Sequence, residues 1–114
     1  MENNLYEEIA SNFKIGINEI EKFNVLIWSY GSSGWDGDAI LILEDKETEE
    51  LFEVHGSHCS CYGLEGQFDL EPTTAEEIKF RLDNNPTYGQ DGTYDHCFRE
   101  DLIKIIDERL LRKN

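Results

Sequence analysis

The chain has 114 residues, of which 39% are hydrophobic, and its 25 acidic against 10 basic residues give a formal net charge of −15. This length supports one modest hydrophobic core, so we expect a single domain spanning residues 1–114. The apolar and aromatic content is sufficient for folding and excludes an intrinsically disordered chain. The negative charge repels nucleic-acid phosphates and anionic membranes and attracts basic protein surfaces, so we expect neither direct nucleic-acid binding nor membrane binding.

The N-terminal segment MENNLYEEIA has neither the basic region nor the apolar stretch of a secretory signal. The longest apolar run, VLIW at 25–28, is too short to cross a bilayer. An odd number of cysteines, three, without an export signal argues against a disulfide framework. We therefore expect a cytoplasmic protein with reduced thiols.

The N-terminal region has the pattern of a helix. Within NNLYEEIASNFK, Leu5, Ile9 and Phe13 recur every four residues, which places them on one apolar face. Gly16 is expected to end this helix, because glycine readily adopts the left-handed conformation found there. The segment INEIEKF (17–23) fits a short helical turn that leads into a strand.

Three segments rich in β-branched and aromatic residues predict strands: FNVLIWSY (23–30), AILILE (39–44) and LFEVHGSHCSC (51–61). Their short connections predict antiparallel pairing in a three-stranded meander. Because residues 23–30 are apolar on both faces, we expect this strand in the centre of the sheet. Strict alternation would put Phe23, Val25 and Ile27 on one face and Leu26, Trp28 and Tyr30 on the other.

The second half has helical patterns. TTAEEIKFRLDNN carries a capping-box signature, Thr74 followed three residues later by Glu77. A final helix, capped by Asp95, is expected to bury a stripe made of Phe98, Leu102, Ile105, Ile106 and Leu110. The order of one helix, three strands and two helices predicts an α+β fold in which the two C-terminal helices pack on the sheet.

The stretch HGSHCSC (55–61) holds two of the three histidines and two of the three cysteines. Zinc takes about four nitrogen or sulfur ligands, so a zinc site is one hypothesis, and a thiol nucleophile activated by a histidine is another. The C-x-C spacing is tighter than the usual zinc pattern, and free cysteines are commonly buried as small apolar residues. We therefore favour packing, with no cofactor and no enzymatic activity. The candidate ligands under the zinc hypothesis are His58, Cys59, Cys61, His96 and Cys97.

The glycine-rich segment GSSGWDGD (31–38) is either a hairpin turn or a recognition loop whose aromatic residue acts as an anchor. An antiparallel meander brings this segment and residues 55–62 to the same end of the sheet. Acidic and aromatic groups gathered there would suit a basic protein surface or a cationic ligand. The predicted binding surface consists of Tyr30, Trp35, Asp36, Asp38, His55, His58 and Tyr62.

The segment EVHGSHCSCYGLEGQFDLEPTT, preceded by a glycine-bearing hairpin and followed by a capped helix, resembles a group of small acidic proteins of bacteria and their phages. The resemblance covers residues 24–80, and GSHCSCYGLEGQ (56–67) is its specific part. It implies a phage or mobile-element context, in which small acidic proteins often act by binding host or defence proteins. It implies no catalytic residue.

The charge and the resemblance together predict a binding protein that inhibits or sequesters a basic host protein, one that handles nucleic acid or serves in defence. Mimicry of DNA would need carboxylates at regular spacing on one face, of which runs such as EDKETEE supply only part. Two alternatives are a zinc-binding or Cys/His-based domain and a protein that sequesters a small ligand through its glycine-rich loop.

Overall fold

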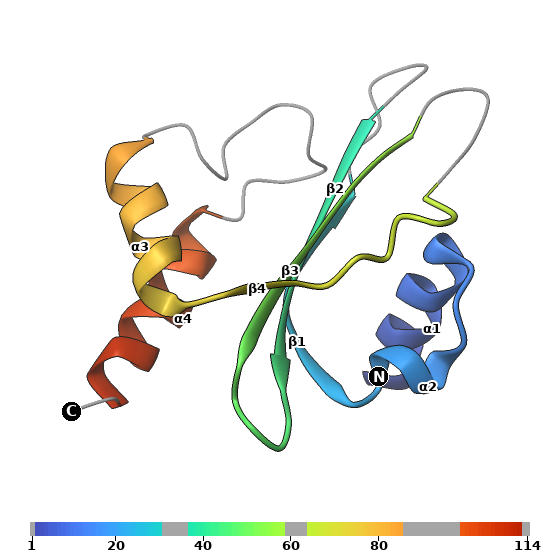
Figure 1. Cartoon of the computed structure of the whole chain (residues 1–114), viewed down its shortest axis with the longest axis horizontal. Coiled ribbons are helices and arrows are strands. Elements are labelled where there is room, and N and C mark those ends of the chain that lie inside the picture. Colours follow the sequence, from blue (N-terminus) through green and yellow to red (C-terminus); the bar gives the residue numbers. More distant parts are fainter. Residues whose placement is uncertain (1, 31–36, 59–63, 86–98, 113–114) are drawn as a thin grey trace.

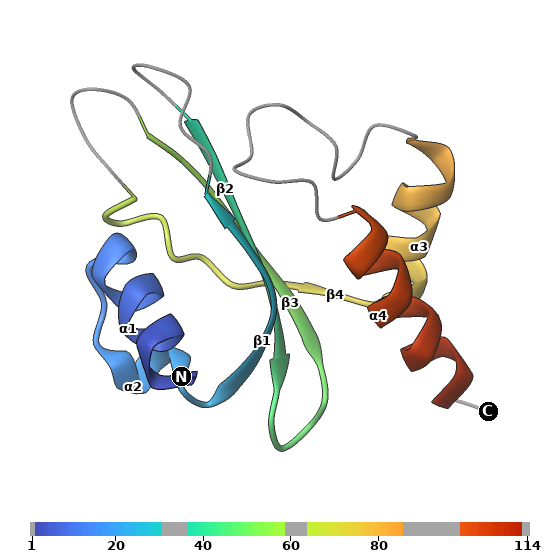
Figure 2. The same cartoon turned by 180° about the vertical axis from the view of Figure 1, so that it is seen from behind.

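The computed structural model describes residues 2–30, 37–58, 64–85 and 99–112. Its elements are α1 (Glu2–Phe13), α2 (Ile17–Ile20), β1 (Phe23–Tyr30), β2 (Gly37–Asp45), β3 (Leu51–His58), β4 (Glu71–Thr73), α3 (Ala75–Asn84) and α4 (Arg99–Arg112). The strands form one antiparallel sheet in the order β1-β2-β3-β4. Helices α1 and α2 lie on one side of this sheet, and α3 and α4 lie on the other (Figures 1 and 2).

The α+β class and the placement of the two C-terminal helices on the sheet are confirmed. The three-strand count is wrong, because β4 adds a fourth strand that pairs with the beginning of β3. This strand covers only Glu71–Thr73 and includes Pro72. A segment so short shows no alternation of apolar and polar residues, and proline is a poor strand former, so its sequence gave no strand signal.

The prediction that β1 lies in the centre of the sheet is also wrong. It stands at the end of the strand order, and β2 has a neighbour on each side. A bulge between Val25 and Ile27 interrupts the β1–β2 register. As a result, Ile27 lies in the core beneath α3 and α4, whereas Val25 and Trp28 pack against the core beneath α1. Strict alternation fails here because one extra residue reverses the faces that follow it.

Helix α1 ends before Gly16. Lys14 adopts the left-handed conformation, with φ of 59°, and the Ile15 amide donates to the Ala10 carbonyl at 3.0 Å. Gly16 instead has an extended backbone and precedes α2, where its amide donates to the Glu19 carboxylate at 3.2 Å. The short helical turn expected within 17–23 is confirmed as α2.

The predicted cap of α3 is confirmed: the Thr74 hydroxyl accepts from the Glu77 amide at 3.1 Å. At the other end of α3, the Arg99 side chain donates to the carbonyls of Leu82 and Asn85, at 2.8 and 2.9 Å. This contact joins the end of α3 to the beginning of α4. The Asp95 cap and Phe98 lie outside the described residues.

The sheet separates two hydrophobic cores. Beneath α1, Phe13 contacts Trp28 and Phe68 through their rings, with centroids 6.0 and 5.5 Å apart. Beneath α3 and α4 the core is aliphatic, and Leu102 and Ile106 of the predicted stripe are buried in it. Strand β2 contributes to both cores, because successive side chains point to opposite faces. Its fully buried residues are Ile40, Leu41, Ile42 and Leu43.

Candidate functional site

Four residues of the predicted binding surface belong to described strands, at the end of the sheet where β1 ends, β2 begins and β3 ends. In the register, Tyr30 lies opposite Ala39 and His58 lies opposite Gly37. The backbones of Tyr30, Asp38, His55 and His58 therefore meet at one end of the sheet, as the antiparallel arrangement requires. Trp35, Asp36 and Tyr62 lie outside the described residues, and so do the side chains of Tyr30, Asp38 and His58. Their joint use in binding stays a prediction.

Four of the five candidate zinc ligands lie outside the described residues: Cys59, Cys61, His96 and Cys97. Within the described ranges, no three His, Cys, Asp or Glu residues are grouped as a metal site requires. The zinc hypothesis therefore depends on segments that the structure does not describe. Elemental analysis of protein purified without a metal-affinity tag tests it, because a structural zinc is retained through purification.

Gly56 has a packing role inside the GSHCSCYGLEGQ segment. A Cβ atom at this position would lie 2.9 Å from Leu64 Cδ2, 3.4 Å from Gln67 Oε1 and 3.7 Å from Phe13 Cε1. Leu64 is buried in the core beneath α1. The two ends of the segment therefore meet against α1, and the absence of a side chain at position 56 permits this close approach. Cys59 and Cys61 lie outside the described residues, so the choice between packing and a metal or thiol site stays a prediction.

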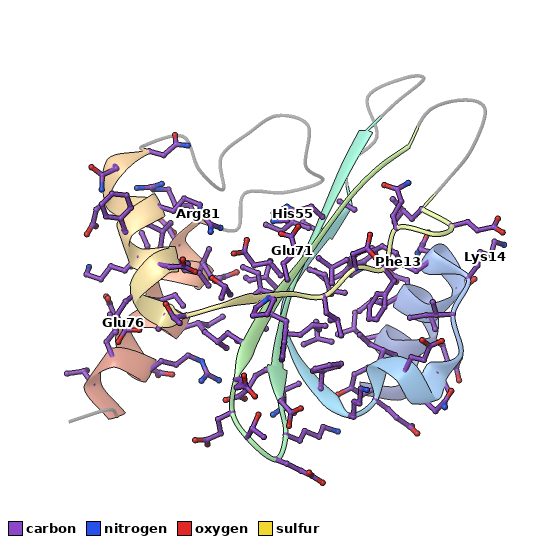
Figure 3. The ribbon with its side chains drawn as sticks, in the orientation of Figure 1. Phe13, Lys14, His55, Glu71, Glu76 and Arg81 are labelled. Atoms are coloured by element: carbon purple, nitrogen blue, oxygen red, sulfur yellow. The ribbon has the colours of Figure 1, made fainter. Side chains whose placement is uncertain are left out.

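A charged cluster lies between β3 and α3. Glu53 is 4% exposed, and its Oε1 accepts from Arg81 Nη1 at 2.6 Å and from His55 Nε2 at 3.0 Å. Arg81 lies on the side of α3 that faces the sheet (Figure 3). Burial alone would raise the pKa of Glu53, but the hydrogen bonds from His55 and Arg81 and their positive charges outweigh burial and lower it from 4.5 to about 2. Glu53 is therefore an ionised acceptor at neutral pH.

His55 connects this buried cluster to the surface near the predicted site. Because Glu53 is ionised, the hydrogen bond between them requires a proton on Nε2 of His55. The other ring nitrogen, Nδ1, takes no part in this contact. The His55 side chain is 44% exposed. This arrangement fixes the orientation of an imidazole that a ligand can reach, so His55 is the best-described member of the predicted surface.

Sequence reasoning missed a second buried ion pair, between Glu44 of β2 and Arg109 of α4. Their side chains are 11% and 12% exposed, and Glu44 Oε1 also accepts from the Asn24 side chain at 3.1 Å. A usable signal existed, because Arg109 follows Leu102 and Ile106 by seven and three residues and so falls on the buried face of the helix.

Two hollows lined by described residues lie away from the predicted site. One, of about 610 Å³, lies at the opposite end of the sheet, where the β2–β3 turn meets the beginning of α3 and Arg109. The buried Nε of Arg109 has no hydrogen-bond partner among the residues that the structure describes. The other hollow, of about 430 Å³, lies between β1 and α4. Both are open depressions and not enclosed catalytic clefts.

The exposed carboxylates of the described residues occur on both outer layers of the molecule. Helices α1, α2, α3 and α4, the α2–β1 connection, the β2–β3 turn and the segment that leads into β4 contribute. The residues on the helices are Glu7, Glu8, Glu19, Glu76, Glu77, Asp83, Glu100, Asp101, Asp107 and Glu108; those elsewhere are Glu21, Glu47, Glu49, Glu50, Glu65, Asp69 and Glu71. A distribution over opposite sides of the sheet does not favour one row of carboxylates that copies a DNA strand.

In comparisons with protein families, curated proteins and solved structures, no match to this chain was found. Among the residues that the structure describes, no helix has the length and apolar character needed to cross a membrane.

Proposed function

We propose that this chain is a small acidic binding protein of phage type that acts in the cytoplasm. Its partner is a basic host protein, one that handles nucleic acid or serves in defence, and binding inhibits or sequesters that partner. No catalytic step is part of the proposal. The phage context depends on the resemblance of residues 24–80, whereas the choice of a basic partner depends on charge.

The observation that carries the proposal is how the positive side chains are used. Arg81 and Arg109 neutralise buried Glu53 and Glu44, and Arg99 binds carbonyls at the end of α3. Each pair contains one negative and one positive side chain, so the two pairs leave the net charge unchanged. The excess of 25 acidic over 10 basic residues therefore stays on the rest of the chain. Such a surface attracts a basic protein and accelerates its association, and salt weakens both effects.

Capture of host proteins on the immobilised chain, at low and at high salt, tests the proposal. We expect basic proteins to be retained at low salt and released as screening shortens the range of the charges. The matched control is a variant in which Glu7, Glu76, Glu100 and Asp107, all exposed, are changed to Gln or Asn, because this lowers the negative charge without touching either buried pair. Captured partners that are not basic, or that stay bound at high salt, would contradict the proposal.

A further inference from the structure

Strand β1 presents an edge that has no partner strand among the described residues. It pairs with β2 on one side and stands at the end of the strand order. Figure 2 shows β1 with α1 on one side of it and α4 on the other. An edge strand offers amides and carbonyls that another extended chain can use, and a basic or bulged edge is a common protection against such pairing. Here a bulge is present, but no lysine or arginine lies within Phe23–Tyr30.

The side chains along this edge are apolar and only partly buried. Val25, Leu26 and Trp28 each keep part of their surface exposed, and so does Ile105 on α4. Leu26, Trp28 and Ile105 line the hollow of about 430 Å³, which is large enough for an aliphatic side chain. Apolar groups at an open strand edge are suited to a partner that supplies both a backbone and an apolar side chain.

The rim of the hollow carries charge. Helix α4 supplies Asp101, Lys104 and Glu108, all exposed, so the rim has one excess negative charge. On the other side of β1, the Trp28 indole donates to the Glu8 carboxylate at 2.6 Å, which adds a further acidic group near the edge. The charge of this surface thus has the same sign as that of the whole chain.

We infer that the β1 edge and the hollow beside α4 bind an extended basic segment of the partner by strand addition. The partner backbone pairs with β1, one of its apolar side chains enters the hollow, and its lysine or arginine side chains lie near Asp101 and Glu108. The inference rests on the proposed function and names the surface that a basic partner uses.

A second copy of this chain fits the edge less well than a basic segment does. Two copies would bring together surfaces that each belong to a chain of net charge −15, which opposes association. The bulge between Val25 and Ile27 also interrupts the ladder, so a strand as long as β1 cannot pair along its whole length. A short extended segment avoids both difficulties.

A short synthetic peptide of alternating lysine and valine is the probe, with a peptide of alternating glutamate and valine as its control. We expect the lysine peptide to shift the backbone amide resonances of β1 and of Asp101 to Glu108, and to slow hydrogen exchange along β1. A lysine peptide N-methylated along its backbone has no backbone amide donors and should bind at least about tenfold more weakly. Equal binding by the N-methylated peptide would overturn strand addition.

Charge-reversed variants locate the surface. Asp101→Lys combined with Glu108→Lys should weaken the lysine peptide about tenfold, because two favourable contacts become repulsive. The matched control, Glu7→Lys combined with Glu65→Lys, makes the same change in net charge away from α4 and should have a smaller effect. Circular dichroism confirms that all variants are folded.

The outcomes separate this inference from the proposed function. If basic host proteins bind the Asp101→Lys, Glu108→Lys variant as tightly as the native chain, the inference about the β1 surface is wrong and the proposed function still holds. Failure of both the lysine peptide and basic proteins to bind would overturn both. Shifts of β1 resonances with protein concentration alone would show that a second copy occupies the edge, which also contradicts the inference.

Discussion

The two faces of the sheet are stabilised in different ways. Beneath α1, aromatic rings and aliphatic side chains fill the core, and the Tyr6 hydroxyl donates to the Phe23 carbonyl at 2.6 Å. Beneath α3 and α4, the aliphatic core is accompanied by buried polar side chains. Among the described residues, all four buried polar or charged side chains lie on this second face: Ser29, Glu44, Glu53 and Thr73.

This difference indicates which face of the sheet depends on charged side chains for its stability. Burying a carboxylate is costly unless a cation and hydrogen bonds accompany it, so each buried glutamate makes the position of its arginine a requirement of the fold. The α1 face has no such requirement among its described residues. Changes in pH or in one member of an ion pair should therefore act on the α3 and α4 face, whereas changes in volume should act on either.

The largest expected effect comes from breaking the Glu44–Arg109 pair. Arg109→Ala removes the arginine that neutralises the buried Glu44 carboxylate, and should lower the free energy of unfolding by about 3–5 kcal/mol. Replacing both residues, Glu44→Leu with Arg109→Met, removes the charge as well as its partner and should cost far less. Urea unfolding of the two variants makes the comparison. An equal loss in both would mean that the charge of the pair is unimportant.

Acid should weaken the same face through Glu53. The pKa of Glu53 is lowered from 4.5 to about 2 in the folded state, so folding releases protons in this range. The stabilisation is complete above pH 4.5 and is lost as pH falls through the folded-state value. The Arg81 and His55 side chains are 36% and 44% exposed, so solvent screens part of their effect. We therefore expect Glu53 ionisation to contribute about 2–3 kcal/mol to the free energy of unfolding.

Thermal unfolding as a function of pH measures this contribution. In a Glu53→Gln variant the difference in stability from the native chain should shrink towards acidic pH, since the native carboxyl becomes protonated there. Glu65→Gln, at an exposed carboxylate, is the matched control. A constant difference between pH 5 and pH 2 would contradict the assignment.

A volume change tests the α1 face. Gly56→Ala places a methyl group 2.9 Å from Leu64 Cδ2 and should destabilise the fold by about 1–2 kcal/mol, because Leu64 is buried and cannot easily move. The loss should be the same at neutral and at acidic pH. In the double variant, Gly56→Ala with Leu64→Val, the shorter side chain makes room for the methyl group. Its loss in free energy of unfolding should therefore be smaller than the sum of the losses in the two single variants.

The smallest effect is expected in the β2–β3 turn, which lies outside both faces. Glu49 has a φ of 66°, where a side chain is disfavoured, so Glu49→Gly should stabilise the fold by about 0.5–1 kcal/mol. Asp45 organises this turn: its carboxylate accepts from the Thr48 and Glu47 amides, contacts that lower its pKa. Glu50→Gly, in the same turn and without a positive φ, serves as the control and should bring no gain in thermal stability.

Local patterns predicted much of the fold, since periodicity and caps depend on neighbouring residues. The four-residue spacing of Leu5, Ile9 and Phe13 predicted α1, and Thr74 with Glu77 predicted the beginning of α3. The centre and edge of the sheet could not be assigned in this way. Strand β1 is apolar on both faces because helices cover both, and it stands at the edge because it is the first strand of the meander and pairs only with β2 among the described strands.

The candidate site, too, was predicted from the sequence only in part. The order of the strands was enough to predict that Tyr30, Asp38, His55 and His58 belong to one end of the sheet, because antiparallel strands return to the end from which they started. The pairing of Glu53 with Arg81 could not be predicted, because the two residues lie 28 positions apart in the chain. Such a contact exists only after α3 packs on the sheet.

The sequence by itself determined the sign of the surface charge, the kinds of element and the residues able to bury themselves, because these depend on composition and on spacing of a few residues. Only the tertiary structure decided which carboxylates are buried, which arginines neutralise them and which strand has an open edge. These are contacts between distant parts of the chain, and their free energy depends on burial and geometry that no local pattern contains.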